Sequence, residues 1–291
     1  MSRERVDIRL ERDYNAATMY FHNESLSTCE ENLAFDEALV ETADAIPFGE
    51  SGTDESAFSF GSTNEVLRVW ELKSPCVVLG RASKWCEEVD EVACLNDGVP
   101  VLRRASGGAS IVAGPGCLMY SVLISYLNRP AWRGLDVAHQ QVMNRVCDAV
   151  QRTVDIFQLP LTISIQGTCD LTIDGRKLSG NALRCKRNWM LYHGTILYSM
   201  PLEWLTLYLL EPPRQPDYRQ AREHGSFVTN ILDKTDSVNA IEFRQTLERQ
   251  LAITWEANQP WLSCPWRHET DVQAKRLLAE RYTNLQWHRS R

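Results

Sequence analysis

Two glycine-containing segments place basic side chains beside backbone that can approach a ligand closely. In the first, RRASGGASIV, Arg103 and Arg104 precede the turn Ser106-Gly107-Gly108. Glycine carries no Cβ, so its amide can approach an anion, and a neighbouring arginine can add bidentate, charge-assisted hydrogen bonds. Successive strand residues point to opposite faces, so one arginine faces the turn, and we predict Arg104. The competing interpretation is a hairpin turn with two solvated arginines.

The second segment, DLTIDGRKLSGNA, places Lys177 after an Asp-Gly turn and before small residues. A lysine between small residues can point into a cleft and contact a carboxylate, a phosphate or a thioester carbonyl. Asp170 lies across the expected hairpin and could hold the lysine or a magnesium ion. A solvent-exposed hairpin lysine is the competing interpretation. His193 and Gly194 follow on a strand, where a lone histidine is more often structural.

Composition limits the class of protein. The chain has 291 residues, 44% of them hydrophobic, and a formal net charge of -7. The acidic balance disfavours bulk nucleic-acid binding, and no apolar run approaches the roughly 18 residues that cross a membrane. The N-terminus shows no apolar signal region, so we expect a cytoplasmic protein. Nine scattered cysteines without a Cys-x-x-Cys pair are typical of free thiols in a reducing compartment.

Hydrophobic periodicity predicts an α+β fold with a mixed or antiparallel sheet. The pattern predicts helices over 30–42, 135–159, 203–210, 241–257 and 271–282. It predicts strands over 66–72, 75–81, 99–105, 161–166, 169–180 and 193–199, and two strands within 110–126 that a Gly-Pro-Gly break separates. Gly-, Ser- and acid-rich residues 47–65 indicate a flexible insertion.

Six motifs in order give a more specific indication than any one of them. They are NLAFDEAL, VVLGR, RRASGGAS, DLTIDGRKLSGNA, HGTILY and FVTNI, within residues 30 to 235. In this order they resemble the lipoate–protein ligase family, part of the biotin/lipoate ligase and octanoyltransferase superfamily. The resemblance implies a fold like the biotin-ligase catalytic core, with a central mixed sheet flanked by helices. We therefore expect a catalytic domain over 1–235 and a short C-terminal helical extension over 236–291.

The resemblance also implies a reaction and a site. ATP and lipoate, or octanoate, would form an acyl-adenylate, and the acyl group would pass to a lysine of a lipoyl carrier domain or a glycine-cleavage H-type protein. Lys177 would be catalytic and would contact the carboxyl group and the α-phosphate. Asp170 would be a magnesium ligand, and no bound prosthetic group is expected. The implied substrate- and nucleotide-binding residues are Arg104, Ser106, Gly107, Gly108, Ala109, Ser110, Ile111, Val112, Ser179, Gly180, Asn181, Ala182, His193 and Gly194.

The chain departs from the family pattern at several positions. Ala109 replaces the third glycine of the turn, Ala113-Gly114 replaces a His-Asp pair, and Cys169 replaces the asparagine before the acid. An octanoyltransferase therefore stays open as an alternative, with Cys169 as a nucleophile activated by Lys177 and acyl carrier protein as the donor. A non-catalytic acyl-binding homologue is the third possibility. A biotin ligase is disfavoured because its GRGRxGRxW-type motif is missing.

Overall fold

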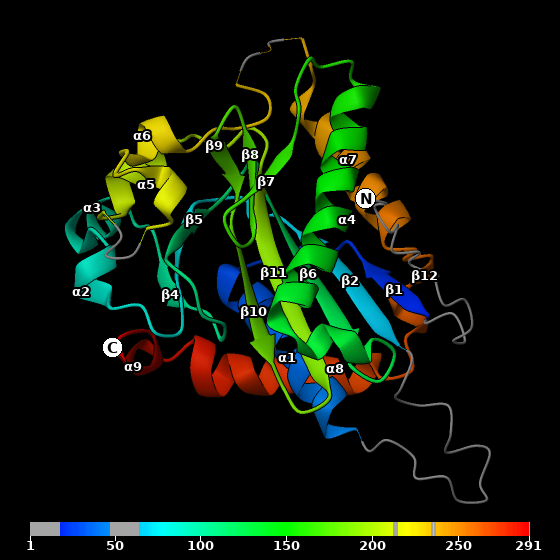
Figure 1. The fold of residues 1–291 in the computed structure, drawn as a ribbon. Helices are drawn as coiled ribbons and strands as arrows, with labels where there is room; N and C mark the ends of the chain where they lie inside the picture. Colours follow the sequence, from blue (N-terminus) through cyan, green and yellow to red (C-terminus); the bar gives the residue numbers. More distant parts are fainter. Residues whose placement is uncertain (1–17, 47–63, 212–214, 234, 236, 291) are drawn as a thin grey trace, which may run out of the picture.

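A six-stranded mixed sheet forms the centre of the molecule in the computed structural model, which describes residues 18–46, 64–211, 215–233, 235 and 237–290 (Figure 1). The strand order is β10-β11-β6-β2-β1-β12. The two pairs that β1 makes are parallel, and the other pairs are antiparallel. The strands are β1 (Met19–His22), β2 (Glu65–Trp70), β6 (Cys117–Ser125), β10 (Asn181–Cys185), β11 (Trp189–Leu197) and β12 (Gln259–Pro260).

Two three-stranded sheets lie beside the central sheet. One has the order β4-β3-β5 and contains β3 (Cys76–Leu79), β4 (Val101–Arg103) and β5 (Ile111–Ala113). The other has the order β7-β8-β9 and contains β7 (Ser164–Gln166), β8 (Asp170–Ile173) and β9 (Arg176–Ser179). Each small sheet contributes to one of the two glycine-containing segments, so the two segments meet where these sheets approach the central one.

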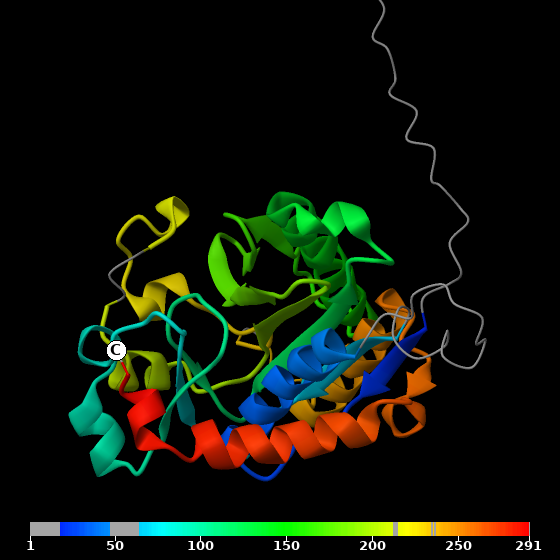
Figure 2. The same cartoon turned by 90° about the horizontal axis from the view of Figure 1, so that it is seen from below.

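Long helices cover both faces of the central sheet. Helices α4 (Leu135–Ile156) and α7 (Ala240–Thr254) pack together on one face, and α1 (Cys29–Ala45) packs with α8 (Arg267–Leu277) on the other (Figure 2). Strand β6 supplies both cores by alternation: Tyr120 and Val122 face α4, while Leu123 packs in the core that includes α1. Helix α1 begins at a capping box in which Thr28 and Glu31 satisfy each other's backbone N–H groups.

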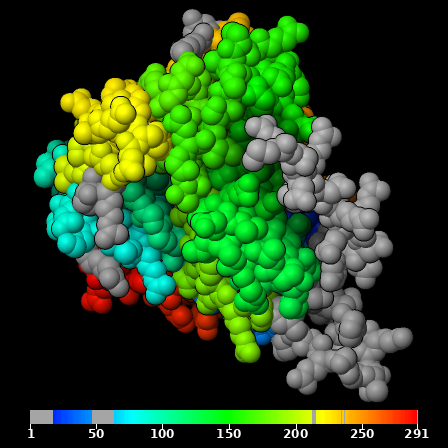
Figure 3. Space-filling view, in the orientation of Figure 1, coloured from blue at the N-terminus to red at the C-terminus, as the bar shows by residue number. Residues whose placement is uncertain are grey.

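Short helices surround one end of the small sheets. They are α2 (Trp85–Glu88), α3 (Glu91–Asn96), α5 (Glu203–Tyr208), α6 (His224–Phe227) and α9 (Leu285–His288). In Figure 3 the yellow segment that carries α5 and α6 forms a lobe beside the green β7–β9 region. We call the described residues of 203–228 the lid, because they cover one side of the cavity described below.

The predicted fold class is confirmed, and the predicted helices are present near their expected bounds. One difference concerns 66–72 and 75–81: these strands follow each other in the chain, but β2 joins the central sheet and β3 a small one. Most of the predicted insertion 47–65 lies outside the described residues, although Glu65 itself begins β2 and is buried. The division of the chain at residue 235 stays a prediction. None of the helices described is long and apolar enough to cross a membrane.

Candidate active site

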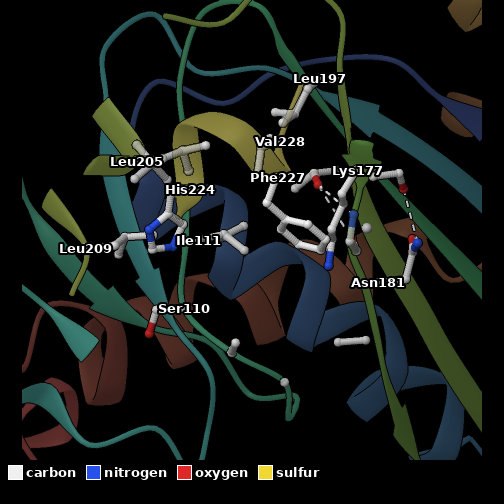
Figure 4. A pocket seen from close by; sticks show the side chains of 18 of the residues that line it. Ser110, Ile111, Lys177, Asn181, Leu197, Leu205, Leu209, His224, Phe227 and Val228 are labelled. Atoms are coloured by element: carbon white, nitrogen blue, oxygen red, sulfur yellow. Dashed lines mark hydrogen bonds between the residues drawn. The ribbon is translucent and has the colours of Figure 1, made fainter. Parts of the chain in front are cut away.

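A cavity of about 190 Å³ lies between the lid and the two glycine-containing segments (Figure 4). Backbone and small side chains from 108–112, 177–182 and 193–195 form its polar wall. Apolar side chains form the rest of the lining: Ile111, Val112, Met119, Leu197, Leu205, Leu209, Leu210, Phe227 and Val228. A cavity lined by both polar and apolar groups suits a ligand that has an anionic head and a hydrocarbon tail.

Lys177 reaches this cavity from the β8–β9 hairpin. Asp174 and Gly175 have positive φ angles of 51° and 70°, as expected for the tight Asp-Gly hairpin turn predicted from the sequence. The Lys177 Nζ atom lies 2.8 Å from Asp170 Oδ1, and 27% of the lysine side chain is exposed. A Cβ added at Gly180 would lie 3.1 Å from Cε and Nζ of Lys177, so the small residue leaves room for the lysine.

Asp170 uses both carboxylate oxygens within the protein. Oδ1 pairs with Lys177. Oδ2 accepts a 2.6 Å hydrogen bond from the hydroxyl of Tyr218 on the lid, and burial together with this carboxylate raises the pKa of Tyr218 well above its ordinary value. In the described part of the chain, no three His, Cys, Asp or Glu side chains gather to hold a metal ion. The magnesium role of Asp170 therefore stays a prediction, and its observed contacts are those of a group that orients Lys177.

Arg104 lies at the cavity wall and holds the glycine-containing turn in shape. Its guanidinium donates to the main-chain oxygens of Val78, Gly107 and Ala109 at 3.1, 2.5 and 3.0 Å. Burial lowers the pKa of Arg104 to about 10. Gly108 has φ +88°, and a Cβ there would lie 2.8 Å from Arg104 Nη2, so glycine is required beside the guanidinium.

The two arginines separate as strand alternation predicted. Arg104 faces the cavity, and Arg103 points away toward the C-terminal helix α9, where it donates to the main-chain oxygen of His288. Arg103 has no exposed surface and Arg104 is 7% exposed, so neither side chain is solvated. The interpretation of the segment as an ordinary solvated turn is therefore wrong.

His193 is a structural and a cavity-lining residue at once. Its Nε2 lies 2.5 Å from the hydroxyl of Ser106, and its Nδ1 lies 3.8 Å from Asp36 Oδ2. Asp36 in turn accepts from the Arg68 guanidinium at 2.5 Å and from the Ser121 hydroxyl at 2.7 Å. Burial is the largest influence and opposes ionisation of this carboxyl, but Arg68, His193 and Ser121 together outweigh it and lower the pKa of Asp36. A chain of polar groups thus fixes the imidazole at the cavity wall.

Asn181 links the central sheet to the second glycine-containing segment. Its Oδ1 accepts from the hydroxyl of Tyr120, and its Nδ2 donates to the main-chain oxygen of Cys169 at 2.5 Å. Gly194 lies opposite on β11, and a Cβ there would overlap the Asn181 amide. A side chain at position 194 would therefore displace the Asn181 amide.

Cys169 lies behind the cavity wall rather than on it. Its thiol donates to the main-chain oxygen of Asn181 at 3.7 Å. Burial, and next the Asp170 carboxylate, raise the pKa of the Cys169 thiol despite the nearby lysine. A thiol with a raised pKa is mostly protonated near neutral pH and is a weak nucleophile.

The structure brings most of the predicted residues to one cavity. Those that line it are Arg104, Gly108, Ala109, Ser110, Ile111, Val112, Lys177, Ser179, Gly180, Asn181, Ala182, His193 and Gly194. Ser106, Cys169 and Asp170 lie behind the lining residues, and Ser106 and Asp170 contact residues of the lining. Gly107 is exposed and is not part of the lining.

Sequence reasoning missed the lid and Glu88. Leu205 and Leu209 line the cavity from the helix expected over 203–210, where the only signal was apolar spacing. Arg219 and His224 line it from beyond that helix, where no pattern marked them. Glu88 accepts from the Ser110 main-chain N–H and hydroxyl at 2.9 and 2.7 Å and so anchors the glycine-containing segment. No local pattern marks Glu88, because its role depends on contacts across 22 residues of chain.

Known proteins resemble this chain in sequence and in fold. It is 23% identical over 222 residues to lipoate-protein ligase LplJ of Bacillus subtilis; the match covers 76% of this chain and 63% of that protein. Its fold is similar to that of a bipartite lipoate protein ligase from Thermoplasma acidophilum, with a TM-score of 0.68, 20% identity and coverage of 95% and 97% of the two chains.

Two further findings concern the same fold and family. A lipoate-protein ligase A solved with ATP bound gives a TM-score of 0.64 at 19% identity, with 94% of this chain and 99% of that chain covered. The family model of the lipoyl protein ligase A/B catalytic domain matches residues 28–252, which include both glycine-containing segments and the lid. The chain therefore belongs to the lipoyl protein ligase A/B catalytic domain family.

Proposed function

We propose that this protein is a lipoate–protein ligase that activates lipoate or octanoate with ATP. The carboxylate would attack the α-phosphate, and pyrophosphate would leave. A carrier lysine amine would then attack the acyl carbon of the acyl-adenylate, which would form an amide and release AMP. The carrier would be a lipoyl domain or a glycine-cleavage H-type protein. The names of the similar proteins support this proposal, since they include lipoate-protein ligases, one reported with its E2 lipoyl domain and one with bound ATP.

The position of Lys177 is the observation that carries the proposal. Lys177 lines the cavity together with the glycine-containing segments and with apolar side chains, so it could contact both the carboxyl group of a fatty acyl chain and an α-phosphate. Attack on phosphorus builds negative charge, and a fixed ammonium group with nearby backbone N–H groups stabilises that charge. Asp170 holds the ammonium group in place. Magnesium carried by the nucleotide would supply further charge compensation.

The octanoyltransferase alternative receives less support from the site. A transferase would use Cys169 as a thiolate in contact with the substrate. Cys169 is not part of the cavity lining, and burial raises the pKa of its thiol. These two properties favour the ATP-dependent ligase.

One reaction mixture tests the proposal directly. The protein is incubated with lipoate, ATP·Mg²⁺ and an unmodified lipoyl domain, and both the adenylate and the carrier are followed by mass spectrometry. We expect lipoyl-adenylate without the carrier, and a carrier mass increase of one lipoyl group when all components are present. Carrier modification by octanoyl carrier protein in the absence of ATP would instead establish the transferase. No adduct from either donor would leave an acyl-binding protein without catalysis.

A further inference from the structure

An arginine and a histidine of the lid converge on one carboxylate at the far end of the cavity. Arg219 Nη2 lies 2.6 Å from Glu211 Oε2, and His224 Nδ1 lies 3.2 Å from Glu211 Oε1. Arg219 and His224 both line the cavity that contains Lys177. Figure 4 shows His224 on the opposite side of this cavity from Lys177, with the ring of Phe227 between them.

The Arg219 guanidinium is held in place by its contacts, whereas the Glu211 carboxylate is largely exposed. Arg219 is 4% exposed, its guanidinium lies over the Phe227 ring at 5.0 Å, and its Nε donates to the Arg222 main-chain oxygen at 2.8 Å. Glu211 is 52% exposed. An ion pair with a half-exposed carboxylate is screened by water and contributes little, so the carboxylate can leave readily. A buried guanidinium without any anion is costly, so another anion must then take its place.

We propose that Arg219 and His224 form a second anion subsite of the cavity, which binds the terminal phosphates of the nucleotide after displacing Glu211. This inference rests on the proposed function, because it assigns the polyphosphate end of the ATP that Lys177 would contact at its α-phosphate. The Glu211 carboxylate presents one oxygen to the Arg219 guanidinium and the other to the His224 imidazole, as a phosphate group would.

The chemistry favours phosphate over the carboxylate that now occupies the subsite. A guanidinium fork matches two phosphate oxygens, and charge-assisted bonds to phosphate are short and strong. A di- or triphosphate also carries more negative charge than one glutamate. Phe227 restricts the orientation of the guanidinium, so little side-chain freedom remains to be lost when the phosphate binds.

Binding of ATP and of AMP to the wild-type protein and to variants, each measured by calorimetry without lipoate, tests the subsite. We expect Arg219→Gln to weaken ATP binding on the order of tenfold, through loss of one charge-assisted contact. AMP binding should stay within about twofold, because AMP lacks the terminal phosphates. Glu211→Gln should tighten ATP binding by roughly threefold or more, since it removes the competing carboxylate.

Glu223→Gln is the matched control, because Glu223 is an exposed acid of the same lid and its neutralisation changes the net charge equally. Equal tightening by both glutamate variants would reduce the effect to general electrostatics and overturn the subsite. Unchanged ATP affinity in folded Arg219→Gln, or equal losses for ATP and AMP, would overturn it too. If Arg219→Gln does not fold, the same measurement is made on His224→Gln. A loss of ATP affinity without an equal loss of AMP affinity would again support the subsite, and its absence would overturn it.

The outcome separates this inference from the proposed function. A wild-type protein that makes lipoyl-adenylate, with lid variants that bind ATP normally, keeps the ligase and removes the subsite. A wild-type protein that binds neither ATP nor AMP removes the proposed function and the subsite together.

Discussion

The main-chain N–H of Arg103 donates a 2.9 Å hydrogen bond to Nδ1 of His288, which lies 185 residues further along the chain. The Nε2 atom of the same imidazole lies 2.9 Å from the main-chain oxygen of Tyr282. These two contacts require the neutral tautomer with the proton on Nε2. The Arg103 guanidinium also donates to the main-chain oxygens of Gly80 and Ser83 at 2.8 and 2.7 Å. Helix α9 therefore holds the strand end from which the Arg104 turn begins.

The His288 contact predicts different effects for two substitutions that replace the imidazole with an amide. His288→Asn can keep an acceptor near the Nδ1 position, whereas His288→Gln places its amide near Nε2 and leaves the buried Arg103 N–H without a partner. An unsatisfied buried donor costs about 1–3 kcal/mol. We therefore expect His288→Gln to lower thermal stability and to raise the KM for ATP more than His288→Asn does. Gln286→Ala, an exposed change in the same helix, is the control. Equal thermal stability and equal KM for ATP in the His288→Asn and His288→Gln variants would show that the Nδ1 contact does not matter.

Lys177→Ala should abolish most of the catalysis while the fold persists. Removing one preorganised charge that stabilises a developing oxyanion costs on the order of 10²-fold or more in rate. Single-turnover formation of the acyl-adenylate measures this loss, and circular dichroism checks the fold. Lys73→Ala removes an exposed lysine outside the cavity lining and should leave the rate unchanged. A Lys177→Ala rate within a few-fold of wild type would refute the assignment.

Asp170→Asn tests the positioning of the lysine separately. The amide keeps the size of the carboxylate but loses the charge that pairs with Lys177 and the strong acceptor for Tyr218. We expect a lower kcat, with KM for the acyl substrate affected less, because the ammonium group remains present but is less well fixed. Tyr218→Phe should also lower kcat, but by a smaller factor. A normal kcat in both variants would mean that Lys177 needs no orienting partner.

Cys169→Ser and Cys169→Asn should both retain activity in the ATP-dependent reaction. The thiol lies behind the cavity wall, and burial raises its pKa. A transferase would instead lose turnover with serine, because a neutral hydroxyl is a far weaker nucleophile than a thiolate. Intact-protein mass spectrometry after exposure to octanoyl carrier protein without ATP checks this. An octanoyl thioester on Cys169 would overturn the ligase assignment.

Acid should destabilise the fold through His22. Burial, and next the Arg68 guanidinium, lower the pKa of His22 to about 3, and its ring packs 4.9 Å from that of Phe35. The folded state thus binds a proton less readily than the unfolded state, whose histidine pKa is near 6.5. The free energy of unfolding is therefore unaffected by His22 above about pH 6.5. It decreases as the pH falls from 6.5 towards 3, because the unfolded state gains the proton first. A His22→Phe variant should unfold at lower pH in acid titrations; an unchanged acid midpoint would contradict this account.

The local parts of the site could be predicted from sequence, because they depend on neighbouring residues. The Asp174-Gly175 turn fixes where Lys177 appears, and strand alternation separates Arg103 from Arg104. The contacts of these side chains could not be predicted. Tyr218 reaches Asp170 across 48 residues, and His288 reaches Arg103 from a distant helix. Such pairs arise from tertiary packing, for which hydrophobic periodicity carries no signal.

The central sheet also determines how this molecule must fold. Its strand β1 pairs on one side with β2 and on the other with β12, so that Tyr20 lies opposite Gln259 near the other end of the described chain. Closing such large loops costs chain entropy before any contact compensates for it, and topologies rich in distant contacts fold slowly. The cavity walls come from segments spread across the chain, so they can form only after these distant strands and helices have docked. In refolding, nucleotide binding should therefore appear with the slowest kinetic phase, after most helical signal has returned.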